Sequence, residues 1–258
     1  MADINTGNSI PQDCAYANFQ GLDGPGVNLS HRCFLAANFQ GAQLQRANLS
    51  ACDLRRVQFQ GADLSEAQLT DACLNRADLR QANLRGAVLE GAKLQGALYD
   101  TQTLWPEGFN YKRSGAVGPA AQLNGAYLNT VDLREVDLQQ ANLLGAYLSG
   151  ADLSGANLQG AVLSGSDLRR AYLTGACLRN ARFNGADLAG VDFRAADLSD
   201  VELEHINSIA GADFFLVQGL SDANRAKLLG RPAAELDVWN AFTRRTTRES
   251  LTPTAVEG

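Results

Sequence analysis

Histidine, the side chain used most often as a general acid or base, is scarce in this chain of 258 residues. Only two histidines occur, His31 and His205, far apart in the sequence. A Ser-His-Asp or Cys-His arrangement needs its members within hydrogen-bond reach, and no G-x-S-x-G, G-x-x-x-x-G-K or H-E-x-x-H motif is present. We therefore predict no catalytic residue, no cofactor and no enzymatic activity.

The cysteines are the other candidates for chemistry, as metal ligands or disulfides. They are odd in number and form no C-x-x-C pair: Cys14, Cys33, Cys52, Cys73 and Cys177. The sequence shows neither a signal peptide nor an apolar run of about 18 residues. We expect reduced thiols, no metal site, no membrane contact and a cytoplasmic location.

A five-residue repeat determines where these groups lie. Counting in fives gives an unbroken apolar set from Leu29 to Tyr99, and a second set in a shifted phase from Leu123 to Leu203. A small residue, usually Ala, stands two places before most of these positions, and Asp or Asn usually stands directly before them. The repeated unit is therefore A-(D/N)-L-x-x.

A period of five fits neither the helix nor the strand. Each unit must form one short extended side and then turn, so that Leu and Ala stay inside at every repeat. Four sides close a coil, and residues twenty apart stack in parallel at about 4.8 Å. The Asp, Asn and Gly residues suit the turns between sides.

These units resemble the pentapeptide-repeat family. The resemblance implies an all-β solenoid, a right-handed quadrilateral parallel β-helix without a cofactor. The sequence departs from the family pattern at Arg32 and Ser166, which take inner positions, and at Gly24, which ends the first run toward the N-terminus. On such a coil Cys52 points inward and Cys33 outward, which argues against a shared metal site.

Paired aspartates such as Asp132 and Asp152, or Asp167 and Asp187, are expected to stack on outer walls. Acid–base catalysis would need a cleft around them, which a convex rod does not offer. We interpret them as solvated turn residues.

Residues 100–120 interrupt the repeat. Leu104 and Leu123 are nineteen residues apart, one short of a coil, so we expect both to face the axis while the segment loops outward. The segment resembles a Y-D-x-x-T-x-F-P-x-G-F insertion of cyanobacterial family members, with Trp105 in place of Phe. Two interpretations stay open: a structural plug, or a recognition loop.

The C-terminal part predicts helices that cover the open end of the solenoid. Ser221 can cap a helix over 222–229 that Gly230 ends. A second helix is expected over 233–242, with Leu236, Trp239 and Phe242 on one face and Trp239 against the last coil. The predicted domains are an irregular N-terminal cap (1–26), the β-helix (27–205), a helical cap (206–251) and a disordered tail (252–258).

Charge separates two classes of function. The net charge is −6 overall, with −5 in residues 121–205 and +1 in residues 27–101. Some family members bind gyrase by resembling B-DNA, which carries one negative charge per about 1.7 Å. A rod of about 40 Å with that charge density would be far more negative than this chain.

Two outer features remain as candidate contacts. The first half carries a basic patch of arginines, in which Arg56 and Arg76 stack: Arg55, Arg56, Arg76, Arg80 and Arg85. This patch either contacts an acidic protein or phosphate or forms surface ion pairs with Asp53 and Asp78. Tyr127 and Tyr147 stack on another wall, either at an interface or merely protecting the wall.

We therefore predict a non-enzymatic protein-interaction, scaffolding or regulatory protein. It is expected to bind an unidentified protein partner, to bind no nucleic acid directly, and to be a monomer or weak dimer. The alternative is a DNA-mimicking, gyrase-binding protein. The candidate contact residues are Trp105, Phe109, Tyr111, Lys112, Arg113, Tyr127 and Tyr147.

Overall fold

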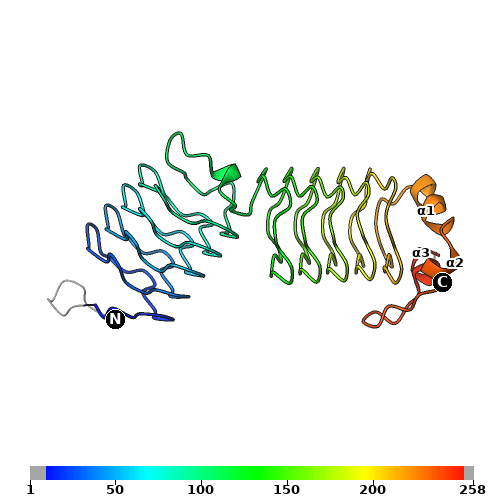
Figure 1. Cartoon of the computed structure of the whole chain (residues 1–258), viewed down its shortest axis with the longest axis horizontal. Coiled ribbons are helices and arrows are strands. Elements are labelled where there is room, and N and C mark those ends of the chain that lie inside the picture. Colours follow the sequence, from blue (N-terminus) through cyan, green and yellow to red (C-terminus); the bar gives the residue numbers. More distant parts are fainter. Residues whose placement is uncertain (1–9, 253–258) are drawn as a thin grey trace, which may run out of the picture. The chain divides into compact units, whose positions relative to one another are not determined.

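A computed structural model describes residues 10–252 of the chain. It contains two compact units, Met1–Ala121 and Gln122–Gly258, and in each of them the chain winds through successive flattened coils (Figure 1). Parallel backbone bridges join residues twenty apart, as between Asn38 and Gln58 in the first unit and between Asp152 and Tyr172 in the second. The predicted twenty-residue coil is confirmed.

Each side of a coil is too short to be a strand. It holds one bridge residue, after which the chain turns again. The second corner residue takes a left-handed backbone, as at Gly150 (φ 66°) and Arg170 (φ 59°). The N–H of Gly150 donates to the carbonyl of Arg169 in the next coil at 2.9 Å, so the corners also hold neighbouring coils together.

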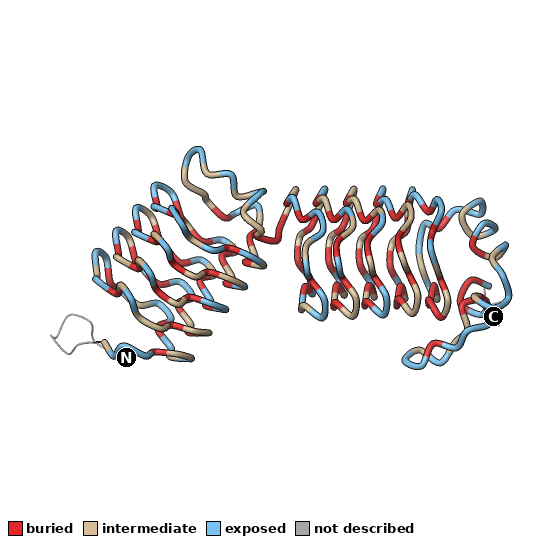
Figure 2. The backbone as a smooth tube through the Cα atoms, viewed as in Figure 1, coloured by how far each residue is buried: buried red, intermediate tan, exposed pale blue. Residues whose placement is uncertain are grey.

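The apolar set that the period predicted fills the interior of both units. Every position counted in fives from Leu29 to Tyr99 and from Leu123 to Leu203 is buried, and buried positions recur along the coils (Figure 2). Inner alanines such as Ala156 are fully buried. The prediction of the core is confirmed, and each coil shares its interior with its neighbours.

The first coil begins earlier than predicted. We expected an irregular cap over 1–26, but a parallel bridge already joins Asp13 to Cys33. The buried Phe19 ring stacks 4.7 Å from a phenylalanine ring of the next coil. The cap prediction is wrong from Asp13 onward, because the five-residue phase continues through Gly24 despite its missing side chain.

An extra corner residue shifts the phase at the start of the interruption. Asp100 Oδ1 accepts from Thr103 N at 2.9 Å, and Thr103 Oγ1 donates to Leu79 O at 2.9 Å. Thr103 thus takes the buried inner position, and Leu104 takes the outward bridge position opposite Asn83. The prediction that Leu104 faces the axis is wrong for this reason.

The coils also continue beyond the predicted boundary at residue 205. Parallel bridges extend to Gln218, and Ile209 and Phe214 are buried axis residues. One added residue in the corner before Ile209 accounts for the shifted phase. The boundary between β-helix and C-terminal cap therefore lies after Gln218.

Three short helices follow: α1 (Asp222–Leu229), α2 (Ala233–Leu236) and α3 (Thr247–Leu251). Ser221 Oγ accepts from Asn224 N at 3.2 Å at the start of α1, and Gly230 follows its end, as predicted. No helix among residues 10–252 is long and apolar enough to cross a membrane.

The second predicted helix is wrong beyond Leu236, and so is the predicted place of Trp239. Residues 238–246 form a hairpin, here called the strap, in which Trp239 and Thr246 make an antiparallel bridge. Trp239 is 57% exposed, so it does not pack against the last coil. Neighbouring side chains alternate in an extended segment, and the strap turns Asn240 inward, which leaves Trp239 outside.

Polar groups cover the last coil instead. Ile209 N donates to Glu235 Oε2 at 3.0 Å, and Thr247 Oγ1 donates to Ile209 O at 3.1 Å. Phe214 N donates to Ser250 Oγ at 3.0 Å. These bonds satisfy backbone groups that an open solenoid end would leave unpaired. The helical segment is therefore a cap, in which these polar bonds accompany the buried Leu228, Leu236 and Leu251. Of the apolar face that we predicted, Leu236 is buried, whereas Trp239 and Phe242 are exposed. Residues 253–258 of the predicted tail lie outside the described residues.

Candidate functional site: a tyrosine wall and a strapped hollow

The aromatic residues of the interruption pack on one another in the first unit. The Trp105 ring stacks on Tyr111 at 5.3 Å and an interplanar angle of 2°, and on Phe109 at 5.6 Å. Tyr99 meets both Trp105 and Tyr111 edge-on. Trp105, Phe109 and Tyr111 are each half-buried. This packing is what the plug interpretation requires, and it leaves little ring surface for a partner.

The basic end of the loop is more accessible. The 3-10 helix η2 (Tyr111–Arg113) exposes Lys112 and Arg113. The Lys112 ammonium lies 5.9 Å from the centre of the Tyr111 ring. Of the five loop residues predicted as contacts, only these two are exposed.

Tyr127 and Tyr147 lie on one wall of the second unit. A parallel bridge joins them, and their rings stack at 4.8 Å with an interplanar angle of 3°. They are 79% and 43% exposed. The same bridges continue to Asp167 and Asp187, and these four residues are called the tyrosine wall below. The predicted stacking of the two tyrosines is confirmed.

Ion pairs neutralise much of the acidic surface of the second unit. Arg169 Nη2 lies 2.7 Å from Asp167 Oδ2, and this hydrogen bond lowers the pKa of the aspartate. The hydrogen bond from Arg134 lowers the pKa of Asp132 to about 2. Each arginine follows its aspartate by two residues, so the repeat itself brings the pair together at a corner.

The arginines of the basic patch in the first unit fall into two groups. Arg55 and Arg80 pair with Asp53 and Asp78 at 2.6 and 2.5 Å. The surface ion pairing that we predicted for this patch is therefore confirmed for Arg55 and Arg80, whereas Arg56 and Arg76 make no ion pair within the described residues.

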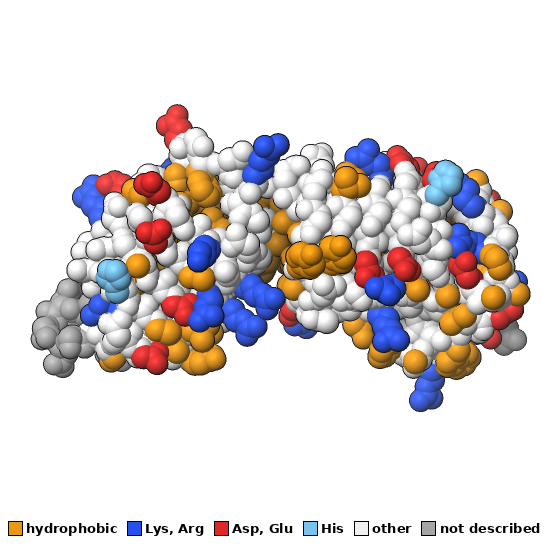
Figure 3. Space-filling view, in the orientation of Figure 1, with side chains coloured by type: hydrophobic (Ala, Val, Ile, Leu, Met, Phe, Trp, Pro, Cys, Tyr) orange, Lys and Arg blue, Asp and Glu red, His pale blue; other side chains and the backbone are white. Residues whose placement is uncertain are grey.

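The strap and the coil corner beside the tyrosine wall enclose a hollow of about 770 Å³. The corner contributes Ser149, Arg169, Arg170, Ala189, Gly190, Ala210 and Gly211, and residues 238–242 form the opposite side. Ser149 follows Tyr147 by two residues, so the hollow adjoins the tyrosine wall. In Figure 3, hydrophobic side chains lie beside acidic and basic ones on the second unit.

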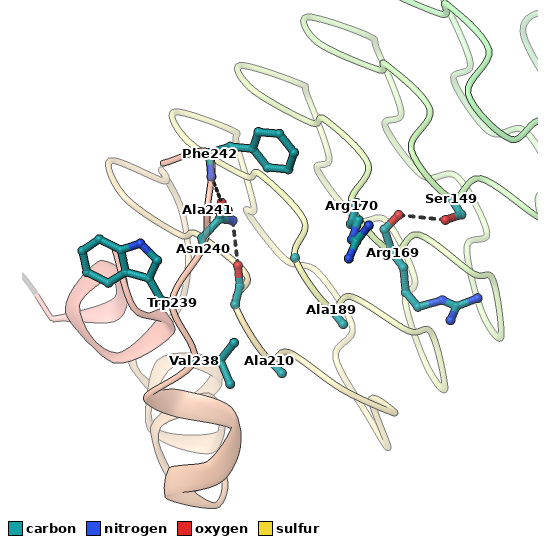
Figure 4. A pocket seen from close by; sticks show the side chains of 12 residues that line it. Ser149, Arg169, Arg170, Ala189, Ala210, Val238, Trp239, Asn240, Ala241 and Phe242 are labelled. Atoms are coloured by element: carbon teal, nitrogen blue, oxygen red, sulfur yellow. Dashed lines mark hydrogen bonds between the residues drawn. The ribbon is translucent and has the colours of Figure 1, made fainter. Parts of the chain in front are cut away.

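One buried residue anchors the strap over this corner. Asn240 is 4% exposed; its Nδ2 donates to Gly211 O at 2.7 Å, and its Oδ1 accepts from Phe242 N at 2.9 Å. In Figure 4, Val238 points toward Ala210, whereas the Trp239 ring points away from the hollow. Trp239 therefore lines it with its main chain rather than with its ring.

At the strap turn, Phe242 reaches a second coil wall. Its ring meets Tyr172 edge-on at 6.0 Å and stays 65% exposed. Below the strap, the guanidinium of Arg245 lies 3.7 Å from the centre of the Phe215 ring. Together with the Asn240 anchor, these contacts fix the position of the hairpin.

No group of three or more His, Cys, Asp or Glu side chains among residues 10–252 is arranged to hold a metal ion. The five cysteines are free thiols, and burial raises the pKa of Cys14 and Cys52, which keeps these two thiols protonated and unreactive. The exposed groups offer aromatic faces, guanidinium donors and small-residue corners.

The five-residue repeat predicts the tyrosine wall but not the hollow. Tyr127 and Tyr147 are twenty residues apart in phase, whereas the strap has no repeat. A signal for the hollow existed in the corner pairs Ala189-Gly190 and Ala210-Gly211, where other corners carry larger residues. Small residues in consecutive corners are typical of a wall that another segment approaches closely.

Comparison with known sequences identifies the repeats. Eight copies of the family described as Pentapeptide repeats match, over residues 33–71, 62–98, 120–155, 146–185 and 176–207. No curated protein sequence gives a match.

Several solved structures are similar. HetL, a pentapeptide repeat protein involved in heterocyst differentiation regulation from the cyanobacterium Nostoc, is 29% identical over 80% of this chain and 81% of its own, with a TM-score of 0.34. Another pentapeptide repeat protein from Nostoc is 36% identical over 41% of this chain and 83% of its own, with a TM-score of 0.32. QnrB1, a plasmid-mediated fluoroquinolone resistance protein, is 22% identical over 78% of this chain and 86% of its own, with a TM-score of 0.30.

Proposed function

Because this chain belongs to the pentapeptide-repeat family, we propose that it is a non-enzymatic interaction protein whose protein partner docks on the second unit. The observation that supports the proposal is the exposed, stacked pair Tyr127 and Tyr147. Tyrosines of this kind are enriched at interfaces, because they bring large contact areas with few rotatable bonds.

The neighbourhood of the pair favours an interface over mere cover for the wall. Leu144, in the corner before Tyr147, is 48% exposed, and the hollow opens on the other side of Tyr147. A contiguous surface of exposed apolar residues with a polar rim is typical of a docking site. Asp167 and Arg169 would form part of that rim.

The DNA-mimic alternative has less support. A B-DNA mimic needs a dense array of unpaired negative charge. Here Asp132, Asp167 and Asp192 each pair with an arginine at 2.6–2.7 Å. We expect no inhibition of gyrase supercoiling by the purified protein; half-maximal inhibition at an equimolar ratio would favour the alternative.

The interaction proposal is tested by a native pull-down with quantitative mass spectrometry from the source cell. The bait is the full chain, compared with a Tyr127→Ala/Tyr147→Ala variant. Tyr16→Ala is the matched control, because Tyr16 is 76% exposed but lies in the first unit. A stoichiometric partner that is lost with the double variant and retained with the control is the expected result.

A further variant separates the loop from the wall. Lys112→Ala/Arg113→Ala removes the accessible charges of the interruption and leaves the aromatic cluster intact. If this variant alone loses the partner, the contact lies on the loop, and the proposal for the second unit is wrong.

A further inference from the structure

We propose that the hollow between the strap and the coil corner binds a short extended peptide segment of a protein partner, in which an apolar side chain lies close to an aspartate or glutamate. The inference rests on the proposed interaction function and specifies the chemistry of the segment. Three properties of the hollow support it, each carried by different residues.

The first property is an apolar lining that the protein leaves partly exposed. Val238 and Phe242 are 37% and 65% exposed, although the strap that carries them is fixed by a buried anchor. Ala189 and Ala210 form the opposite floor and have no bulk to fill the space. An apolar side chain of a partner would remove this surface from water, which is favourable.

The second property is unpaired positive charge. Arg169 is held by Asp167, and its Nε lies 3.8 Å from Asp187. Arg170, the next residue, lines the hollow and has no side-chain hydrogen bond or ion pair within residues 10–252. Its aliphatic stem packs beside Gly190, where an added Cβ would lie 3.3 Å from Arg170 Cγ.

This packing orients the Arg170 guanidinium without neutralising it. Arg244 on the strap likewise has no ion pair in the described part of the chain. A carboxylate is the group that the planar guanidinium fork binds best among protein side chains.

The third property is an open main chain. Ala241 lines the hollow, and within residues 10–252 its N–H and C=O make no hydrogen bond. An extended peptide can satisfy such groups with its own backbone, which gives affinity while side-chain pockets give specificity. Val238 and Arg170 would supply these pockets on either side of the bound segment.

The test uses the full chain and a positional library of fluorescein-labelled hexapeptides with blocked ends, measured by fluorescence polarisation. Blocked ends exclude a terminal carboxylate as the bound group. We expect selection of Asp or Glu at one position and of Leu, Ile or Val at a nearby position. Raising the salt concentration should weaken binding of the selected peptide, because its carboxylate pairs with an exposed arginine.

Two variants locate the binding. Arg170→Gln should weaken the selected peptide about tenfold and abolish the acidic preference, and Ala189→Leu should weaken all peptides by filling the floor. Arg182→Gln is the matched control, because Arg182 is also exposed and unpaired among the described residues but lies on another wall. Unchanged circular dichroism would show that each variant is folded.

Selection without an acidic preference, or binding that Arg170→Gln leaves intact, overturns the proposal. So does a library without any selected sequence. A library without a selected sequence does not contradict the proposed interaction function if the pull-down still depends on Tyr127 and Tyr147. If the pull-down does not depend on Tyr127 and Tyr147 but the selected peptide still binds, the partner contacts the hollow alone.

Discussion

Gly118 shows how little space the chain leaves where the first unit ends. A Cβ on this residue would lie 2.6 Å from the Tyr99 carbonyl oxygen and 2.8 Å from two atoms of its ring. The Tyr99 hydroxyl donates to Pro119 O at 2.7 Å and so fixes the ring. Glycine is required here by close approach rather than by its backbone conformation.

We expect Gly118→Ala to lower the free energy of unfolding by about 1–3 kcal/mol, because neither the carbonyl nor the tethered ring can move away freely. Urea unfolding followed by circular dichroism measures the change. Gly125→Asn is the control: a Cβ there meets nothing within 4 Å, and asparagine tolerates its φ of +63°. An equal decrease in the free energy of unfolding for both variants would contradict the requirement for close approach at Gly118.

Trp105 makes the plug interpretation testable at one side chain. It stacks on Tyr111 and Phe109, while its buried Nε1 has no hydrogen-bond partner among the described residues. Trp105→Phe keeps a ring and removes the unpaired donor, so we expect a change below about 1 kcal/mol. Trp105→Ala should destabilise the protein by about 3 kcal/mol. If both variants unfold like the wild type, the aromatic cluster is not a structural plug.

The strap depends on one polar anchor. Asn240→Ala would remove the bonds to Gly211 O, Phe242 N and Thr243 N. The carbonyl of Gly211 would lose its partner beneath the strap, at a cost of about 1–3 kcal/mol. We expect faster hydrogen exchange confined to residues 238–246. Exchange that rises equally in the coils would show that the strap and coils unfold together.

The elements also show what the five-residue period can predict. It placed the coil, its axis residues and the stacked tyrosines, because a repeat fixes the position of each side chain by counting. It failed wherever a single residue was added, as before Thr103 and before Ile209, because an added corner residue changes the phase without changing composition. The strap escaped prediction since its position depends on long-range bonds, such as that from Asn240 to Gly211. Helical spacing of Leu236, Trp239 and Phe242 was coincidental.

Repeated ion pairs make the stability of the fold depend on pH. Hydrogen bonds from Arg134 and Arg169 hold the pKa of Asp132 at about 2 and that of Asp167 below its ordinary value near 4. A carboxyl whose pKa is lower in the folded state stabilises the fold above its unfolded pKa. That contribution is lost as the pH falls through the folded pKa. Stability should therefore decline between about pH 5 and pH 2.

Thermal unfolding across this pH range measures the decline. An Arg134→Gln/Arg169→Gln variant should show a shallower decline, by a modest amount because Arg134 and Arg169 are exposed. An Arg182→Gln variant should follow the wild type. A slope that is unchanged in the double variant would assign the acid sensitivity to other carboxylates.

The twenty-residue register has a consequence for how such a chain can change over generations. Duplicating or deleting one whole coil returns every later side chain to its original wall, so the tyrosines and the strap would keep their relative direction and change only their separation. Gaining five residues preserves the alternation of inside and outside but turns everything beyond it by one wall. Small tandem duplications could thus redirect one recognition feature relative to another without redesigning either, a route to new partners that an ordinary globular core does not offer.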